Sequence, residues 1–347
     1  MVTAGYPRKP LTRMGTNRST QLDAQTAGAG LAPPALKVTA NDTTVGITPW
    51  WPGPRRVFAR LRNLLRHNRF DEPALATIIG HFEIVRLMRH PHLKPILRKD
   101  PYAPFRPFRT YLSPTFSRAQ RRALLREHYF HLTNCLHESF FSQIVLGAPM
   151  LWEHAVGRDR VGITISLSEC QFEGDLLLEF QLNSQALFHI GMTIAPGQLV
   201  DSPAVRAILI ARVQGVRGTW GEIRRATKVC SDVWPPFLLM SAVQAIARAT
   251  DITCIAGVRN SQKQWLPGEK SPDVLFDYDQ FWEQLSASAG SRFYLMPVPM
   301  LGRPLEQVSV NHRKRTLLRR QFKQSVEDLV HDRFIAAFCA PRLTVKK

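Results

Sequence analysis

The sequence predicts a mixed α/β domain with a mostly antiparallel sheet, one β-α-β crossover and a basic helical region in front of it. Three observations predict this fold class. Apolar residues recur with a helical period before Gly157 and with a period of two after it. Short polar connections separate the alternating runs. Further on, an apolar helix leads straight into a continuous apolar strand, which is typical of a crossover to a parallel neighbour.

The first part of the chain is predicted to be helical and basic. Residues 1–50 lack periodicity, so we expect an N-terminal extension without a fold of its own. Residues 51–150 should form a basic helical region that packs on the main domain, 151–340. The pattern predicts an extended wrapping segment at the proline-rich stretch 91–116 and helices at 54–69, 72–90 and 117–140, the last with Ser117 as its N-cap.

The second part is predicted to build the sheet. Alternating runs favour an antiparallel meander of four strands, at 161–170, 175–182, 186–194 and 204–215. A helix at 236–250 and a buried strand at 252–258 would form the crossover. A short helix and a last strand should follow, at 276–285 and 291–300.

The charge of the chain predicts an anionic partner. Its 347 residues carry 46 Lys and Arg against 27 Asp and Glu, a net charge of +19. Residues 1–150 hold 22 basic and 8 acidic side chains, so most of the excess lies there. Such an imbalance favours a small anion, a lipid headgroup or nucleic acid as the partner.

Other classes are disfavoured by what the sequence lacks. It has no signal-peptide pattern and no apolar run of about 18 residues, so we expect neither export nor a membrane-spanning segment. Its five scattered cysteines show no C-x-x-C and suit reduced core thiols. No metal-ligand spacing stands out. We therefore expect a cytoplasmic protein that can contact the inner face of the membrane peripherally.

The predicted order of elements is similar to that of the N-acetyltransferase superfamily, whose donor is acyl-CoA. In that fold, a loop after the fourth strand holds a pyrophosphate at a helix N-terminus. The matching loop here is Arg212–Arg217, which makes Gln214, Gly215 and Arg217 candidate contacts. The match is partial, because Arg217 replaces a small residue and about twenty residues separate the loop from the predicted helix 236–250.

Acyl transfer also needs a base near the acceptor. Glu179 and His189 fall on the more polar face of neighbouring predicted strands and could meet as a cross-strand pair. His189 is then the candidate base and Glu179 the residue that orients it. The alternative is an ordinary polar face of a sheet.

Two groups of cations could bind the anion. Arg224, Arg225 and Lys228 lie in the crossover. The stretch Asn311–Arg320 should begin a helix that Leu317 and Leu318 dock on the domain, and its candidate contacts are His312, Arg313, Arg315, Arg319 and Arg320. The alternative is that both groups are solvated.

Several motifs resemble the bacterial VirK/YbjX family. They are Arg212–Gly215, Ala226–Lys228, Trp234–Met240, Gly257–Asn260, Tyr278–Glu283, His128–Tyr129 and, most specifically, Asn311–Arg315 with Arg319–Arg320. The resemblance covers roughly residues 54–335, and departures occur at Pro236 and Ser231–Val233. It implies roles in envelope integrity, virulence, resistance to cationic antimicrobial peptides, and stress or DNA-damage responses. It assigns no catalytic residue.

Three functions remain open at this point. The first is an acyltransferase-like enzyme that modifies an envelope component from the cytoplasmic side. The second is a non-enzymatic factor that binds anionic membrane or nucleic acid, with nucleic acid ranked lower because no recognition helix or aromatic platform is visible. The third is a stress protein that binds a partner and no small ligand.

Overall fold

The computed structural model describes residues 74–109, 111–169, 173–262, 276–302 and 304–339. Over these residues the chain forms an eight-stranded sheet with strand order β1-β2-β3-β4-β5-β6-β8-β7. The strands are β1 (Met150–Val156), β2 (Asp159–Leu167), β3 (Leu176–Leu182), β4 (Gln185–Pro196), β5 (Arg206–Gly215), β6 (Cys254–Val258), β7 (Ser288–Ala289) and β8 (Phe293–Pro297). Neighbouring strands are antiparallel except β5 and β6, which are parallel.

Helices precede the sheet, join its parallel strands and follow it. The helices are α2 (Ala74–Met88), α3 (Lys94–Lys99), α4 (Arg118–Cys135), α5 (Glu138–Leu146), α6 (Trp220–Val229), α7 (Pro235–Ala249), α8 (Tyr278–Gln284) and α9 (Val310–Phe338). Short 3-10 turns include η1 (Pro91–Leu93) and η2 (Ala103–Phe108). A capping box at Ser117 and Gln120 fixes the start of α4.

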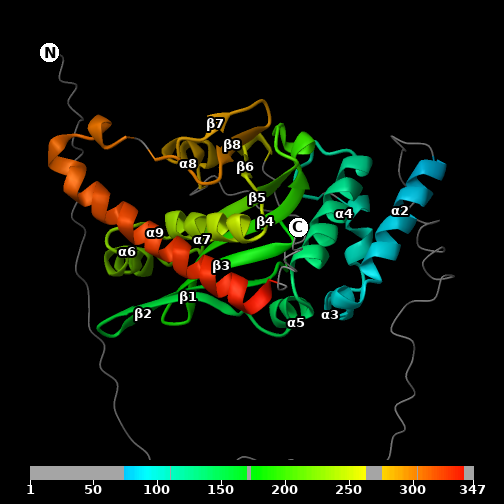
Figure 1. Ribbon diagram of the computed structural model, residues 1–347, viewed down its shortest axis with the longest axis horizontal. Helices are drawn as coiled ribbons and strands as arrows, with labels where there is room; N and C mark the ends of the chain where they lie inside the picture. The colour runs from blue at the N-terminus through cyan, green and yellow to red at the C-terminus, as the bar shows by residue number, and fades with distance from the viewer. Residues whose placement is uncertain (1–73, 110, 170–172, 263–275, 303, 340–347) are drawn as a thin grey trace, which may run out of the picture. The chain divides into compact units, whose positions relative to one another are not determined.

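Helices pack on both faces of the sheet (Figure 1). On one face, Phe188 of β4 contacts Trp234 at the start of α7, and α9 packs against α7. On the other face, α4 lies against the end of β4, where the Ile194 N–H donates to His128 Nδ1 over 3.1 Å. Side chains of successive strand residues point to opposite faces, so neighbouring residues of β4 face different helical layers.

A two-residue turn and a bulge together set the register of β3 and β4. Asn183 and Ser184 both have positive φ, 50° and 65°, as a type I′ hairpin turn requires. A bulge follows between Phe180 and Gln181, and this shift of one residue places Glu179 directly opposite His189. The cross-strand pair that the sequence offered as one of two readings is therefore present, although the bulge was not predicted.

The parallel strands β5 and β6 are paired over only three residues of β5, Ile208–Ile210. β5 continues to Gly215, and beyond the paired stretch the Val213 N–H donates to Tyr278 Oη over 2.9 Å. A bulge at Gly191 and Met192 interrupts the pairing of β4 with β5 at the same level. The parallel strands β5 and β6 thus separate towards their carboxyl ends.

The structure confirms the mixed, mostly antiparallel sheet and its crossover, and corrects several details. The predicted helix 117–140 is two helices with a break at Leu136 and His137, and the wrapping segment 91–116 contains η1, α3 and η2. Strand β1 and helix α6 were not predicted, and α9 extends to Phe338. The extension 1–50 and the predicted helix 54–69 lie outside the described residues.

Candidate functional site

A polar row crosses one face of the sheet. Thr164, Glu179, His189 and Gln214 are in register on four adjacent strands. Glu179 Oε2 and His189 Nε2 are 2.8 Å apart, and both side chains are partly exposed. The structure therefore brings the predicted base and its orienting carboxylate together.

The Glu179 carboxylate is held in its charged form. The hydrogen bond from His189 lowers the pKa of Glu179, and a second one, from Gln181 Nε2 to Glu179 Oε1 over 2.6 Å, acts in the same direction. A charged carboxylate at Nε2 favours the His189 tautomer with its proton on that nitrogen. Nδ1 is then the atom that can accept a proton.

The row continues into a charged pair beside Gln214. Arg212 Nε donates to Gln214 Oε1 over 3.2 Å, and Arg212 Nη1 lies 3.0 Å from Glu173 Oε2. Gly191 allows this close packing, because a Cβ there would lie 2.2 Å from the Glu173 carbonyl oxygen. The predicted contact Gln214 thus belongs to the Glu179–His189 side of the sheet.

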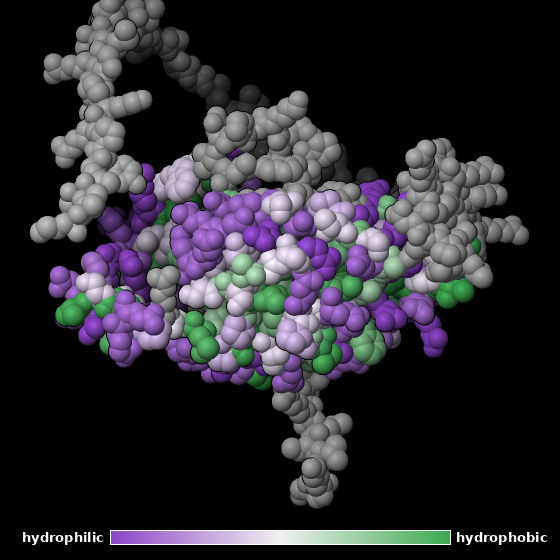
Figure 2. All heavy atoms as spheres, turned by 90° about the horizontal axis from the view of Figure 1, so that it is seen from above, coloured by the Kyte–Doolittle hydropathy of each residue, from purple (hydrophilic) through white to green (hydrophobic). Residues whose placement is uncertain are grey.

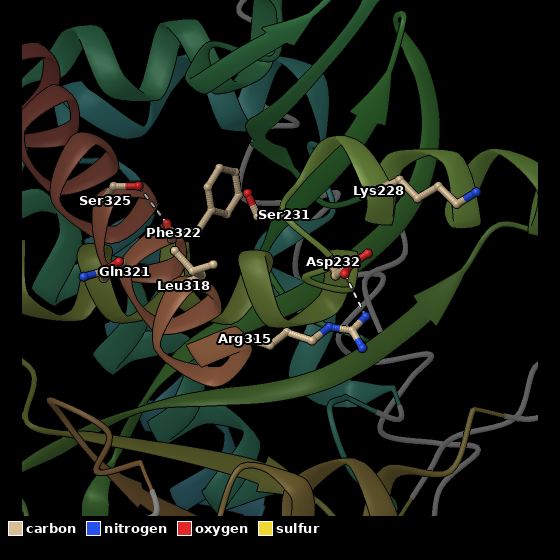
Figure 3. A pocket seen from close by; sticks show the side chains of 8 residues that line it. All are labelled: Lys228, Ser231, Asp232, Arg315, Leu318, Gln321, Phe322 and Ser325. Carbon is tan, nitrogen blue, oxygen red and sulfur yellow. Dashed lines mark hydrogen bonds and ion pairs between the residues drawn. The ribbon is translucent and has the colours of Figure 1, made fainter. Parts of the chain in front are cut away.

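A second candidate site is a groove between α6 and the first turns of α9 (Figure 3). Its volume is about 660 Å³, and its lining residues are Lys228, Ser231, Asp232, Arg315, Leu318, Gln321, Phe322 and Ser325. Arg315 reaches from α9 to Asp232, with Nη2 2.7 Å from Oδ2. Lys228 has no ion-pair partner among the residues that the structure describes. Two predicted cations, one from the crossover and one from the late basic stretch, therefore meet at one groove.

The loop after β5 leads directly into a helix. The predicted helix 236–250 does begin about twenty residues beyond the loop, as α7, but the unpredicted α6 begins at Trp220, five residues beyond Gly215. Thr219, at the N-cap position, donates its hydroxyl to the Val216 carbonyl over 2.8 Å instead of capping α6. Arg217 is exposed in this loop, and Gly218 adopts a φ of +83° with open space around it.

The other late cations do not converge on the groove. Arg313 turns back to the carbonyls of Val308 and Glu306, at 3.0 and 3.3 Å. His312 is exposed, and Arg319 and Arg320 are half-buried. Among the described cations of Asn311–Arg320, Arg315 alone lines this groove.

The expected docking of α9 through Leu317 and Leu318 was wrong. Both side chains are exposed, at 43% and 53%. The helix docks through its later part, where the buried residues are Val326, Val330, Phe334 and Phe338. A helix that begins beyond the body of the domain has no core for its first leucines to enter.

The two candidate sites lie on opposite faces of the sheet. A second cross-strand row contains Trp152, Ile163, Phe180, Phe188 and Gly215, one residue out of step with the Glu179–His189 row. Phe322 of the groove packs on Trp152, with ring centroids 6.1 Å apart. The groove therefore shares the face of Phe188, while His189 points to the other face.

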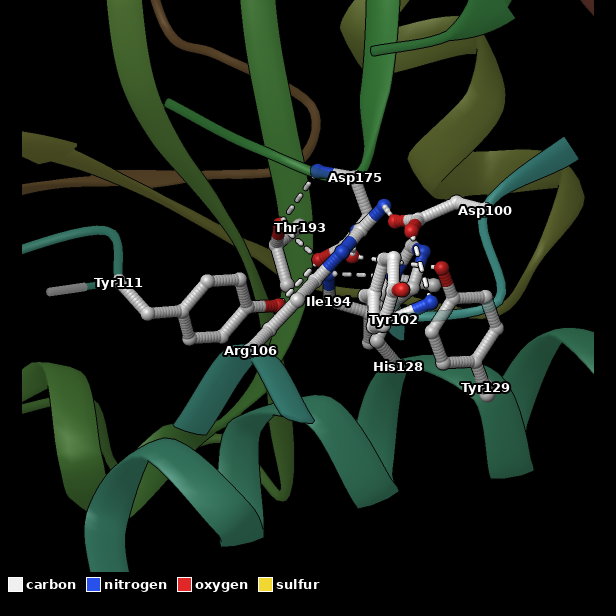
Figure 4. Close-up of polar contacts among 9 residues, drawn as sticks. All are labelled: Asp100, Tyr102, Arg106, Tyr111, His128, Tyr129, Asp175, Thr193 and Ile194. Carbon is white, nitrogen blue, oxygen red and sulfur yellow. Dashed lines mark hydrogen bonds and ion pairs between the residues drawn. The ribbon is translucent and has the colours of Figure 1, made fainter. Parts of the chain in front are cut away.

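A buried polar cluster was missed by sequence reasoning (Figure 4). Asp175 just precedes β3, is fully buried and bonds to Arg106 and Tyr111. Thr193 Oγ1 donates to Asp175 Oδ2 over 2.7 Å, and Arg106 Nη2 donates to Asp100 Oδ2 over 3.0 Å. An Asp at the start of an apolar strand, together with Arg and Tyr in a proline-rich segment, was the available signal.

The protonation states in this cluster follow from burial. Burial alone would raise the pKa of Asp175, but the positive charges of His128, when protonated, and Arg106 and the bonds from Tyr111 and Thr193 lower it. Burial lowers the pKa of His128 to about 4. The cluster at neutral pH is thus an ion pair beside a neutral imidazole, and none of its residues lines the groove between α6 and α9.

The described part of the chain contains neither a cluster of metal-ligating side chains nor a membrane-spanning helix. No three His, Cys, Asp or Glu side chains gather there as metal ligands would. None of the described helices has the length and apolar character needed to cross a bilayer.

Comparison with known proteins identifies relatives. The family model for a protein of unknown function (DUF535) matches residues 79–328. The chain is 26% identical to the uncharacterized protein YbjX of Escherichia coli over 68% of this chain and 73% of that protein. It is 22% identical to an uncharacterized protein of Haemophilus influenzae over 33% of this chain and 40% of that one. No solved structure matches. The chain therefore belongs to the DUF535 family, the VirK/YbjX group that its motifs resemble.

Proposed function

We propose that the protein is an acyltransferase-like enzyme that uses an acyl-CoA donor to modify a component of the bacterial envelope. The observation that carries this proposal is the position of the Glu179–His189 pair. It lies beside the end of β5, where the single parallel strand pair separates. In open α/β sheets, ligands bind outside the carboxyl ends of the strands.

The loop between β5 and α6 suits the phosphates of such a donor. Thr219 leaves the first N–H groups of α6 uncapped, and a Cβ at Gly218 or Gly221 would meet no atom within 4 Å. An uncapped helix start with open space in front of it favours a phosphate group. Arg217 adds a positive charge at the same place. Gln214 and Gly215 connect this loop to the polar row.

His189 supplies the base. The amine nitrogen or hydroxyl oxygen of the acceptor attacks the thioester carbonyl carbon, a C–N or C–O bond forms, and the C–S bond breaks. The proton passes to His189 Nδ1 and then to the leaving thiolate, while Glu179 holds the ring and stabilises its charged form. Because the two features lie on opposite faces, a donor held at the α6 loop must reach past the end of β5 to meet His189, which is paired with Gln214 one residue before that end.

Thermal unfolding with a panel of acyl-CoA esters tests the proposal. A ligand at about 100 times its Kd adds about 2.7 kcal/mol to the free energy of unfolding. Release of the CoA thiol, measured with amine and hydroxyl acceptors, should fall roughly 10²–10⁴-fold in His189→Ala while the ligand-induced stabilisation remains.

His331→Ala is the matched control, because His331 pairs with Asp332 on α9, away from the polar row. It should release thiol at the wild-type rate. A protein that is not stabilised by any ester and releases no thiol contradicts the proposal. Full activity in His189→Ala removes His189 from the reaction.

The envelope role completes the proposal. The resemblance to the VirK/YbjX group implies envelope integrity and resistance to cationic peptides, and acylation of a surface component would serve both. A deletion strain complemented with His189→Ala should then remain sensitive to cationic peptides, whereas one complemented with His331→Ala should recover.

A further inference from the structure

The first half of α9, Val310–Lys323, is basic throughout. It carries six Lys and Arg residues and no Asp or Glu. The second half, Gln324–Phe338, carries Glu327, Asp328 and Asp332 and a single basic residue, Arg333. One continuous helix therefore changes its charge near its middle.

The same division appears in the packing of α9. Its buried residues begin at Val326, so none of the described residues in the first half is buried. Figure 1 shows the beginning of α9 beyond the amino-terminal start of α7. Figure 2 shows hydrophilic residues with hydrophobic ones among them at that end of the molecule. The part of the first half up to Leu318 is therefore largely exposed and available to a partner.

Exposed apolar residues accompany the positive charge. Val310, Leu317 and Leu318 are 72%, 43% and 53% exposed. Their spacing places them on one side of the helix, with Lys314 among them, and this side is turned away from buried Val326 and Val330. An apolar stripe that points outward from a basic helix is typical of a helix that lies at a membrane surface.

Helix α6 extends this surface on the other side of the groove. Trp220, Arg224 and Lys228 are exposed and four residues apart, so they form one stripe. Ile223 and Ala226 on the opposite side are buried. The stripe starts with an exposed tryptophan, a residue that favours the membrane–water interface, and ends at the groove with Lys228.

The groove offers both kinds of contact that an anionic lipid can make, a charged one and an apolar one. Lys228 and Arg315 can bind a phosphate, and Leu318 and Phe322 offer apolar contact beside it. Figure 3 shows Lys228 leaving α6 on one side and Arg315 reaching across from α9 to Asp232. Both cations are exposed, so a phosphate can reach them.

We propose that the outer side of α6 and the first half of α9 dock on an anionic lipid bilayer, with a lipid phosphate in the groove between them. Clustered cations favour an anionic bilayer, and each Lys or Arg near the surface strengthens binding about fivefold. The exposed apolar side chains decide between partners, because nucleic-acid backbone contacts need the cations alone. The proposal holds whether or not the protein transfers acyl groups.

Vesicle flotation with the full chain tests this proposal. The wild-type protein should float with vesicles of phosphatidylcholine and phosphatidylglycerol and stay behind with phosphatidylcholine alone. Lys314→Glu and the double variant Leu317→Ser/Leu318→Ser should each lower partitioning about tenfold. Because these side chains are exposed, thermal unfolding of the variants should match that of the wild type.

The chain offers matched controls. Leu329 and Ile335 are exposed apolar residues in the second half of α9, at 57% and 40%, and Arg98 is an exposed cation on α3. Leu329→Ser/Ile335→Ser and Arg98→Glu should bind within about twofold of wild type. Equal losses in test and control variants, or equal flotation on neutral vesicles, would overturn the proposal.

Two further arms separate other anions. Inorganic phosphate at matched ionic strength should leave the protein on the vesicles, and displacement would indicate a site for free phosphate instead of a bilayer. A protein that does not bind anionic vesicles but binds duplex DNA would overturn the proposal in favour of nucleic acid.

Discussion

Two Arg–Asp pairs in this molecule have the same chemistry and opposite surroundings. Arg106 and Asp175 are 2% and 0% exposed, and Tyr111 and Thr193 complete the bonding of the carboxylate. Arg315 and Asp232 are 59% and 44% exposed and line an open groove. Burial decides what each pair can do.

The buried pair has a structural role, because water cannot solvate either charge if the pair is broken. The exposed pair can exchange Asp232 for an incoming anion, since water screens the charges and little free energy holds them together. A cluster of polar side chains therefore indicates a binding site only when solvent reaches it. The following predictions test this contrast, beginning with the largest effect.

Asp175→Ala should lower the free energy of unfolding by about 3–5 kcal/mol, because it leaves the Arg106 guanidinium buried with part of its compensation gone. Urea unfolding followed by circular dichroism measures the change. Asp232→Ala is the control, and it should cost less than about 1 kcal/mol. Similar costs for the two variants would show that burial does not separate the pairs.

His81→Phe should remove part of the acid sensitivity of the buried region. His81 is packed between Phe105 and Phe108, with ring centroids 4.9 and 5.1 Å away. Burial, aided by Arg122, lowers the pKa of His81 from 6.5 to about 4. The unfolded chain therefore binds the extra proton between pH 6.5 and 4, so stability is full above pH 6.5 and is lost as the pH falls through this window.

Between pH 7 and pH 5, the wild type should lose about 2 kcal/mol more stability than His81→Phe. Urea midpoints measured at both pH values give this difference. The phenylalanine keeps the aromatic packing and does not titrate. Parallel pH curves for the two proteins would show that His81 is not buried and neutral.

Arg315→Ala should have the smallest effect on the fold and a clear effect on binding. Its exposed ion pair contributes less than about 1 kcal/mol, so thermal unfolding should hardly change. Flotation on anionic vesicles should weaken about fivefold, as expected for one cation near the surface. A large loss of stability would place Arg315 with the buried pair.

The sheet and the Glu179–His189 pair could be predicted because both depend on local patterns. Alternation identifies the residues of one face, and the two-residue turn at Asn183–Ser184 fixes the hairpin, but the bulge that pairs Glu179 with His189 carries no signal in the sequence. The groove between Lys228 and Arg315 was also anticipated in part, since both residues came from basic stretches. The face of the sheet on which the groove lies could not be predicted, because it depends on the side of the sheet on which the crossover helices pack.

The remaining features depend on contacts between distant residues. Asp175 meets Arg106 and Tyr111 across more than sixty residues of sequence, and no local periodicity reveals such a pairing. Helix α6 is short and contains Gly221, so its helical pattern is weak. Leu317 and Leu318 were assigned to the core because apolar residues usually dock a helix, and an outward-facing stripe is the exception.

The bonds of Asp175 have a consequence for dissecting this protein. Arg106 and Tyr111 precede the first strand in sequence, yet they form hydrogen bonds to the Asp175 carboxylate, which lies between the second and third strands. A fragment that starts at Met150 would keep all eight strands and lose both partners of Asp175. Such a fragment is expected not to fold alone, so residues 100–111 and the sheet should melt together as one cooperative unit, in a single calorimetric transition.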